Sequence, residues 1–308
     1  MRRTKFIFLV LPEVHLLDLA GPDQVLSEAI DFGANFEIVY CGIEHEIQTS
    51  AGLGLHRLMH FSEVAYTAGD YIIIPGSRVK YIMSDAFRKQ EELFHWIARA
   101  YQNEAHLVSI CVGTFVMAET GILNQRACTT HFQLIHQLKK DFPQLKIIEN
   151  VLFISEGRIH TSAGIASGID LMLYLLEGLT DSYFAHKVAK ELVVYNRRKG
   201  ADHQVNPYFY YRNHVHYGIH SVQDHIIEKI DQKHDLASLA EVACMSERNL
   251  TRTFKQETGL TVNQFITQVR VQKLREFSRM PDLSKSQLAS KVGLSSEKQV
   301  ERLLRRLD

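Results

Sequence analysis

The stretch Leu107-Val108-Ser109-Ile110-Cys111-Val112-Gly113-Thr114-Phe115 decides the fold of the first part of the chain. Its first four residues form a short apolar run typical of a buried strand, and a helical pattern begins at Phe115. A cysteine between a buried strand and a helix indicates a strand-to-helix elbow, which projects its residue into a crevice at the carboxyl edge of a sheet. Cys111 is therefore the first candidate site residue.

The same alternation extends on both sides of this elbow. Buried strands are predicted at residues 6–10, 36–40, 71–74, 107–110, 151–155 and 158–161. Helices are predicted between and after them, at residues 14–30, 85–101, 115–121, 132–140, 164–178 and 181–198. Strands that alternate with helices predict an α/β fold with a doubly wound, mostly parallel sheet covered by helices on both faces.

Length and composition fit two globular domains. The chain has 308 residues, with 45% hydrophobic and 23% charged residues. No apolar run approaches the ~18 residues of a membrane span, and the basic N-terminus is interpreted as the approach to a first strand rather than a signal peptide. The four cysteines form no CxxC pair, so we expect no metal, no cofactor and a cytoplasmic location. Cys41, Cys128 and Cys244 are interpreted as small core residues.

A polar, aromatic stretch at residues 199–218 separates two different patterns. We expect a first domain at 1–198, this stretch as a linker docked on a domain surface, and a second domain at 219–308. The histidines in and near the linker leave a metal cluster as the alternative, although no carboxylate or thiol stands at a matching ligand spacing.

After Ser221 only short helices are predicted, and they repeat. The pattern Leu239-Ala240, Met245-Ser246, Leu250, Arg252 and Phe254 recurs as Leu288-Ala289, Leu294-Ser295, Val300, Arg302 and Leu304. Net charge changes as well, with 20 basic against 23 acidic residues in 1–220 and 15 against 12 in 221–308. This mild bias hints at a polyanionic partner for the second domain.

Each copy of the repeat predicts a short helix, a tight turn and a second helix. In the first copy Ser246 caps a helix that turns Leu250 and Phe254 inward and leaves a basic, polar face outward. Such a face suits a recognition helix in a DNA major groove, whereas an ordinary helical hairpin with a solvated face is the alternative. The candidate DNA-binding residues are Ser246, Arg248, Asn249, Arg252, Lys255, Ser296, Lys298, Gln299, Arg302 and Arg305.

The segment 239–259, with Phe265 and Arg270 after it, resembles the AraC-type DNA-binding domain. The resemblance covers about residues 219–308 and implies a tandem pair of helix-turn-helix units. Val262 stands where the family usually has proline, Leu294 and Leu304 stand where aromatics are usual, and the sequence runs only four residues past Leu304. We therefore expect a loosely packed second unit, with most base readout from the first.

Several residues around the first domain's sheet edge share a second resemblance. Asp18 follows the first strand, His131 lies in Thr129-Thr130-His131-Phe132, and a small-residue stretch spans Thr161–Asp170. With Cys111 they resemble the PfpI-like branch of the class I glutamine-amidotransferase-like fold, over about residues 4–180. The resemblance implies these ligand-pocket candidates: Asp18, Cys111, Val112, His131, Ser162 and Gly164.

The two domains together resemble the GlxA-like transcriptional regulators. The resemblance implies a dimeric protein that binds promoter DNA and senses a small, nitrogen-containing metabolite near Cys111. Proteolytic members of the superfamily have histidine where this chain has Val112, so we expect no enzymatic activity. The alternatives are a cysteine hydrolase or hydratase, a redox sensor, and a merely structural thiol. As an exposed thiol at a helix N-terminus, Cys111 is expected to have a lowered pKa and to be alkylated before the other cysteines.

Overall fold

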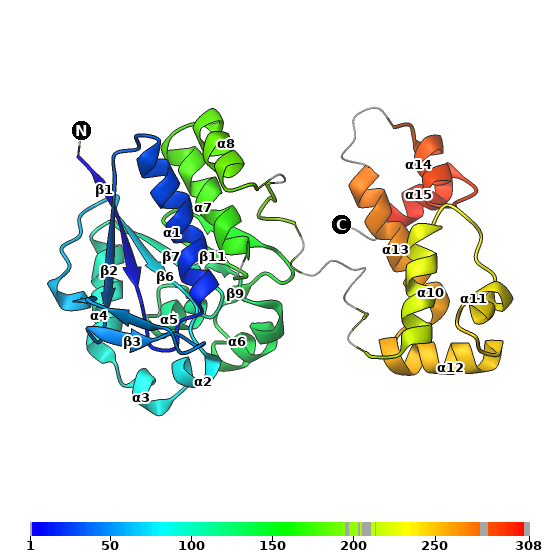
Figure 1. Cartoon of the computed structure of the whole chain (residues 1–308), viewed down its shortest axis with the longest axis horizontal. Helices are drawn as coiled ribbons and strands as arrows, with labels where there is room; N and C mark the ends of the chain where they lie inside the picture. Colours follow the sequence, from blue (N-terminus) through cyan, green and yellow to red (C-terminus); the bar gives the residue numbers. More distant parts are fainter. Residues whose placement is uncertain are drawn as a thin grey trace. The chain divides into compact units, whose positions relative to one another are not determined.

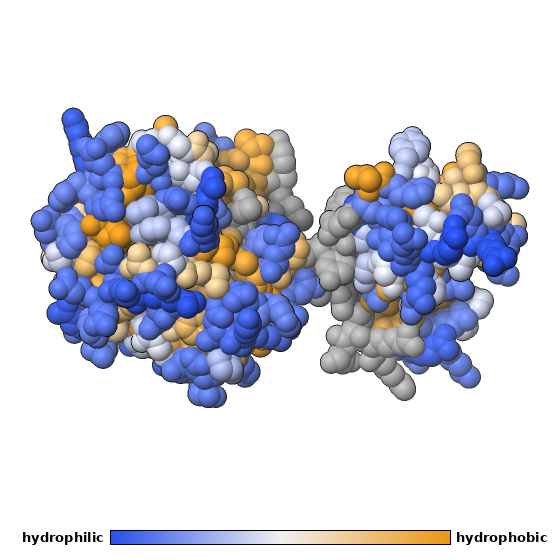
Figure 2. All heavy atoms as spheres, turned by 90° about the horizontal axis from the view of Figure 1, so that it is seen from below, coloured by the Kyte–Doolittle hydropathy of each residue, from blue (hydrophilic) through white to orange (hydrophobic). Residues whose placement is uncertain are grey.

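The computed structural model describes residues 2–164, 166–194, 197–202, 204, 211–212, 214–277 and 283–304. The chain divides into two compact units, Met1–Gln204 and Val205–Asp308, which are described separately. Among the described residues, no helix has both the length and the apolar character needed to cross a membrane. Hydrophilic residues cover most of the face shown in Figure 2, where hydrophobic residues form small separate areas.

The first unit is built on a seven-stranded sheet with the order β10-β11-β7-β6-β1-β2-β5. Its strands are β1 (Thr4–Leu9), β2 (Phe36–Gly42), β5 (Met59–His60), β6 (Tyr71–Ile74), β7 (His106–Ile110), β10 (Phe153–Glu156) and β11 (Ile159–Ser162). All neighbouring pairs are parallel except β10 with β11, which confirms the predicted mostly parallel sheet.

Helices cover both faces of this sheet, as the doubly wound prediction requires. Figure 1 shows α1 (Leu16–Asp31), α7 (Ala166–Leu179) and α8 (Ser182–Glu191) packed together over one face, with α4 (Glu91–Gln102) and α5 (Gly113–Glu119) on the other. The central strands are apolar on both faces, so residues such as Ile72 and Leu107 are fully buried.

Shorter elements complete the first unit. They are β3 (Glu46–Gln48), β4 (Gly54–His56), β8 (Ala127–Cys128), β9 (Lys146–Ile147), α2 (Val79–Ile82), α3 (Asp85–Arg88), α6 (Ile135–Asp141), and the 3₁₀ turns η1 (Phe61–Glu63) and η2 (Phe132–Leu134). The single helix predicted at 85–101 is wrong, because the chain breaks between α3 and α4. Ser84 caps α3 by accepting a hydrogen bond from Phe87 N, and a new helix begins at Glu91.

The second unit is entirely helical in its described residues. Its helices are α10 (Tyr217–Glu228), α11 (Leu236–Val242), α12 (Glu247–Thr258), α13 (Val262–Phe277), α14 (Lys285–Lys291) and α15 (Glu297–Leu304). One core surrounds Phe254 and Phe265, whose ring centroids are 5.6 Å apart. A separate and smaller core contains Leu274, Leu288 and Val300.

Both copies of the repeat form a helix-turn-helix. The turn before α12 places Cys244 at φ 53°, and the equivalent turn before α15 places Gly293 at φ 65°. These left-handed positions are natural for glycine but not for cysteine. Cys244 is also exposed, so its interpretation as a core residue is wrong.

Candidate functional sites

Cys111 occupies a tight elbow between β7 and α5. Its backbone has φ 56°, a left-handed conformation uncommon for a residue with a side chain. Two hydrogen bonds hold the elbow: Cys111 N donates to Ser162 O at 3.0 Å, and Thr130 Oγ1 donates to Cys111 O at 2.7 Å. The neighbouring loops therefore fix the direction of the thiol.

The first turn of α1 brings Asp18 to this thiol. The Asp18 side chain is fully buried and shares a hydrogen bond with Cys111. His15 precedes the helix, and its Nδ1 lies 3.4 Å from Asp18 Oδ2. One donor atom from each of His15, Asp18 and Cys111 lies within 4.8 Å of the others, and this is the one such group among the described residues.

Two glycines from other loops close around the pair. A Cβ atom at Gly76 would lie 2.5 Å from Asp18 Oδ2, and one at Gly164 would lie 2.3 Å from Cys111 Cβ. Because only glycine allows these approaches, the thiol is enclosed on both sides, and Cys111 is 4% exposed. Gly164 thus lies at the site where the sequence predicted it.

The environment of Cys111 favours a protonated thiol. Burial raises the pKa of Cys111, the negative charge of Asp18 raises it further, and the hydrogen bond from Val112 N acts in the opposite direction. The expectation of an exposed thiol with a lowered pKa is therefore wrong. Val112 itself is buried beside the elbow.

The hydrogen bond described for His131 is made within the turn η2 and not with Cys111. Its Nδ1 accepts a hydrogen bond from Gln133 N at 3.4 Å, which caps the turn η2. Burial lowers the pKa of His131, whereas the charge of Asp18 raises it and that of His15 lowers it. His131 is thus within electrostatic range of Asp18, and its described hydrogen bond goes elsewhere.

Two buried hydroxyls add to the polar groups of this region. Ser162 precedes the Gly164 loop, and Ser77 follows Gly76 after strand β6; both are fully buried. Within the described residues, neither Oγ atom has a hydrogen-bond partner. A buried hydroxyl without a partner is costly, so each of these two groups calls for an explanation such as an ordered water or a bound ion.

Sequence reasoning missed His15, Gly76, Ser77 and Thr130. A usable signal exists for two of them, since Pro75-Gly76-Ser77 directly follows a buried strand and so lies at the same sheet edge as Cys111. His15 and Thr130 give no comparable signal, because neither directly follows a predicted strand.

The first helix-turn-helix presents the predicted basic face. Ser246 Oγ accepts a hydrogen bond from Asn249 N at 3.3 Å and so caps α12, whose Leu250 and Phe254 are fully buried. On the opposite side the side chains of Arg248, Arg252 and Lys255 are exposed, and Asn249 is half-buried. Arg252 Nη2 donates to Asn249 Oδ1 at 3.0 Å, which orients both side chains.

The second helix-turn-helix is formed, and its core is smaller. Ser296, Lys298 and Arg302 are exposed, while Gln299 accepts a hydrogen bond from Ser295 N at 2.9 Å. Its fully or nearly fully buried core residues are aliphatic, in contrast to the two phenylalanines of the first unit. Arg305 lies outside the residues that the structure describes.

The two ends of the predicted linker contact different units. Leu152 N donates to Gly200 O at 2.8 Å, and Gln204 Nε2 donates to Thr130 O at 2.9 Å, both within the first unit. In the second unit, Arg212 Nη2 donates to Asp224 Oδ2 at 2.9 Å, and the ring of Tyr211 packs on Phe265. The segment 205–210 lies outside the described residues.

Comparison with known families identifies the two parts of the chain. The model for the DJ-1/PfpI family matches residues 4–178. The chain belongs to the DJ-1/PfpI family. A model described as a helix-turn-helix domain matches residues 239–307, so this DJ-1/PfpI member carries a helix-turn-helix domain as the sequence predicted.

Its relatives include regulators and an enzyme. The chain is 30% identical over 213 residues to the HTH-type transcriptional regulator CdhR of Pseudomonas aeruginosa, covering 66% of this chain and 60% of CdhR. It is 25% identical to the HTH-type transcriptional regulator GlxA of Rhizobium meliloti over 64% of this chain and 61% of GlxA. It is 28% identical to isonitrile hydratase of Pseudomonas putida over 60% of this chain and 76% of that enzyme. The match spans only about 60% of the length of either regulator.

Solved structures support the fold. A THiJ/PfpI family protein from Pseudomonas syringae aligns with TM-score 0.55 and 17% identity, over 79% of this chain and 90% of that one. An AraC family transcriptional regulator from Pseudomonas putida aligns with TM-score 0.51 and 19% identity, over 62% of this chain and 100% of that one.

Proposed function

We propose that this protein is a ligand-responsive, sequence-specific DNA-binding transcription regulator. The observation that carries the proposal is the face of α12, where Arg248, Arg252 and Lys255 are exposed opposite the buried Leu250 and Phe254. A helix anchored on one side and cationic on the other suits the major groove of DNA. The similarity to CdhR and GlxA supports the same function.

The proposed effector site is the region around Cys111 and Asp18. The buried carboxylate of Asp18 favours a ligand with N–H groups and a positive charge, and the buried hydroxyls of Ser77 and Ser162, in the segments around Gly76 and Gly164, add further acceptors. We therefore propose a small nitrogen-containing effector, such as an amine. The pocket candidates Val112, His131 and Gly164 border the same region.

A short hydrogen-bonded path leads from this site to the end of the first unit. Thr130 binds the Cys111 carbonyl through its hydroxyl, and its own carbonyl accepts a hydrogen bond from Gln204. We propose that effector binding acts on the linker through Gln204. Gln204→Ala should then reduce the effector's influence on DNA affinity while leaving effector binding intact.

We propose that the protein is not an enzyme. A cysteine nucleophile reacts as the thiolate, whereas burial and Asp18 favour the thiol here, and the His131 hydrogen bond goes to Gln133. The similarity to isonitrile hydratase makes a hydratase the second candidate. A measurable rate of isonitrile hydration that Cys111→Ser abolishes would replace our proposal with that one.

The full chain tests this function directly. Native mass spectrometry of the purified protein identifies a co-purified small molecule, and fluorescence anisotropy measures binding to DNA from its own promoter with and without that molecule. Asp18→Asn should remove the effector response and keep DNA binding. Asp85→Asn, which makes the same change at an exposed position, serves as the control.

Two results would contradict the proposal: DNA binding with no salt dependence or sequence preference, or an effector response unchanged in Asp18→Asn. We also propose a homodimer, which sedimentation velocity measures on the same sample.

A further inference from the structure

A cavity of about 520 Å³ lies beside the edge strand β10, and none of the residues that line it belongs to the Cys111 site. Its walls come from β10, from α7 and from the segment that follows α8. The lining residues are Phe153, Ser155, Tyr174, Glu177, Arg197, Arg198, Lys199 and Gly200. A smaller cavity of about 330 Å³ shares Ser155, Tyr174 and Glu177 with it, so the two are continuous along α7. This volume is typical of small-molecule sites.

The cavity wall combines aromatic rings with an excess of positive charge. The ring centroids of Phe153 and Tyr174 are 5.3 Å apart, and Tyr174 is 47% exposed. Arg197, Arg198 and Lys199 face a single acidic lining residue, Glu177. Arg198 is neutralised by Asp170, which leaves one net positive charge in the group.

Arg197 is held in place with part of its guanidinium still available. Its Nη2 donates to Leu173 O at 3.3 Å and to Glu177 Oε2 at 2.7 Å. Both hydrogen bonds that it makes to described residues come from this one nitrogen. A planar guanidinium binds carboxylates through two nitrogens, so Arg197 is suited to an incoming anion.

A buried histidine pair fixes the hydroxyl of Ser155. Ser155 Oγ lies 2.8 Å from His160 Nδ1, and His160 Nε2 lies 3.1 Å from His106 Nδ1. His160 is 3% exposed and stacks with His106, so neither ring is free to turn. The hydroxyl is thus a preorganised polar group on the cavity wall.

The segment 197–202 packs closely against the edge strand. Gly200 O accepts hydrogen bonds from Leu152 N at 2.8 Å and Phe153 N at 3.3 Å. A Cβ at Gly200 would lie 2.7 Å from Phe153 O, so glycine permits this approach. A ligand in the cavity therefore touches the sheet, α7 and the segment that leads out of the first unit.

We propose that this cavity binds a small aromatic carboxylate, with its ring on Phe153 and Tyr174 and its carboxylate at Arg197 and Ser155. The binding does not depend on the proposed DNA-binding function. By joining the segment 197–202 to β10 and α7, the ligand stabilises the packed state of that segment.

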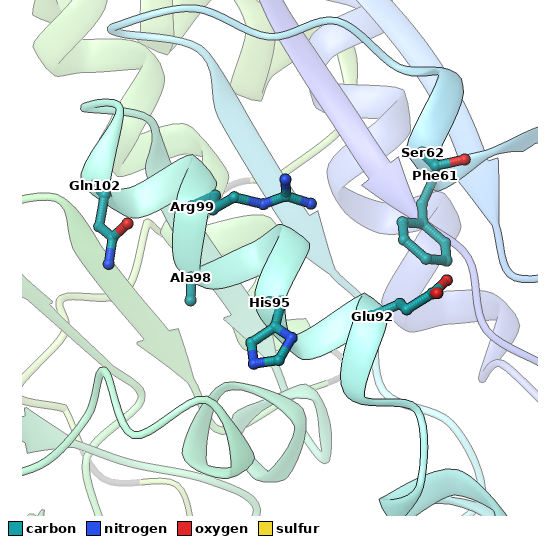
Figure 3. Close-up of a pocket in the computed structure, with 7 residues that line it drawn as sticks. All are labelled: Phe61, Ser62, Glu92, His95, Ala98, Arg99 and Gln102. Atoms are coloured by element: carbon teal, nitrogen blue, oxygen red, sulfur yellow. The ribbon is translucent and has the colours of Figure 1, made fainter.

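A second cavity supplies the control. Figure 3 shows His95, Ala98 and Arg99 along helix α4, with Phe61 and Ser62 across from the start of that helix. This cavity of about 560 Å³ is lined by one arginine, Arg99, and one glutamate, Glu92. Their charges cancel, so with a neutral His95 the lining has no net charge. Arg99→Gln is therefore the matched counterpart of Arg197→Gln.

The test is calorimetric titration of the full chain with benzoate and with its neutral isostere benzamide. Benzoate should bind saturably and benzamide at least about 10-fold more weakly, the effect of one charge-assisted hydrogen bond. Arg197→Gln should weaken benzoate binding by about 10-fold or more, and Tyr174→Ala should weaken it as well. Glu177→Gln should strengthen it, because it releases Arg197, whereas Arg99→Gln should leave it unchanged.

Limited trypsin digestion provides a second measurement. Benzoate should slow cleavage after Arg198 and Lys199, while tryptic sites in the second unit serve as the internal standard. The proposal is wrong if benzoate shows no saturable binding, if Arg197→Gln and Arg99→Gln have equal effects, or if cleavage at the segment is unaffected by bound benzoate.

Discussion

Arg270 joins the two helix-turn-helix units, and its replacement by alanine should loosen the second one. From α13, Arg270 Nε donates to Val292 O at 2.8 Å, and Nη2 donates to Gly293 O at 3.1 Å. Gly293 is also close to the core of the first helix-turn-helix, since a Cβ there would lie 2.6 Å from the carbonyl oxygen of Ile230, a residue of that core. The two helix-turn-helix units have separate hydrophobic cores, and α13 contributes residues to both. The polar contacts of Arg270 add to α13 in setting the position of one helix-turn-helix relative to the other.

The size of the effect follows from the two hydrogen bonds. A hydrogen bond to a charged group contributes about 1.5–3 kcal/mol, and the half-buried position of Arg270 favours the lower end. Two such bonds give about 3 kcal/mol for holding the second unit in place. Lysine keeps the charge and reaches at most one carbonyl well, so Arg270→Lys should lose about half as much.

Native-state hydrogen exchange measures this loss without DNA. A change of about 3 kcal/mol corresponds to ~100-fold faster exchange, expected for amides of α14 and α15 and not for those of α11 and α12. Lys273→Ala is the control, since the ion pair of Lys273 with Glu276 lies within α13. The reasoning would be refuted if the amides of α14 and α15 exchanged equally fast in wild type and Arg270→Ala, or if the substitution accelerated exchange equally in both helix-turn-helix units.

Three further predictions concern groups elsewhere in the chain. Burial lowers the pKa of His160 to about 3, whereas the histidine of the unfolded chain has its ordinary pKa of ~6.5. Below pH ~6.5 the unfolded state therefore binds more protons than the folded state, and the stability of the first unit should fall by about 2 kcal/mol between pH 7 and pH 5. Urea unfolding measures the loss, and an unchanged pH dependence in His160→Gln would contradict it. Iodoacetamide should label the exposed Cys244 first and Cys111 only on unfolding, as peptide mass spectrometry will show; early labelling of Cys111 speaks against a buried thiol. Arg248→Ala should weaken specific DNA binding by about 1–3 kcal/mol, and Lys298→Ala should weaken it by less. Equal losses of affinity, measured by fluorescence anisotropy, would contradict the expected difference between the two helix-turn-helix units.

Most strands of the first unit could be predicted because they are buried on both faces. The strand at Tyr71–Ile74 was predicted with its observed bounds, since four consecutive apolar residues give a strong signal. The short strands β3 and β4 were missed, because three-residue segments with exposed polar ends show no period. The break after α3 was also missed, since it depends on the backbone at Lys89 and Gln90 rather than on hydrophobic spacing.

The elbow at Cys111 could be predicted, and the state of its thiol could not. A strand followed by a helix places the cysteine at the sheet edge, and the first strand similarly directs Asp18 there. The burial of the thiol depends on Gly76 and Gly164, which approach from two loops distant in sequence. Spacing within one segment carries no information about such approaches, so the prediction of an exposed thiol with a lowered pKa failed.

Both ligand sites proposed for the first unit contact the stretch that ends this unit, which comprises the segment 197–202 and Gln204. The Cys111 site reaches it through Thr130 and Gln204, and the carboxylate cavity reaches it through Arg197 and Gly200. A ligand changes an equilibrium only by its difference in affinity between two states. We propose that the packed and unpacked forms of this segment are the pair of states on which both ligands act. If both ligands favour the packed segment, each must strengthen the binding of the other by the same factor, because such coupling is reciprocal. If both proposals hold, the first unit would respond to two chemically different ligands through one segment.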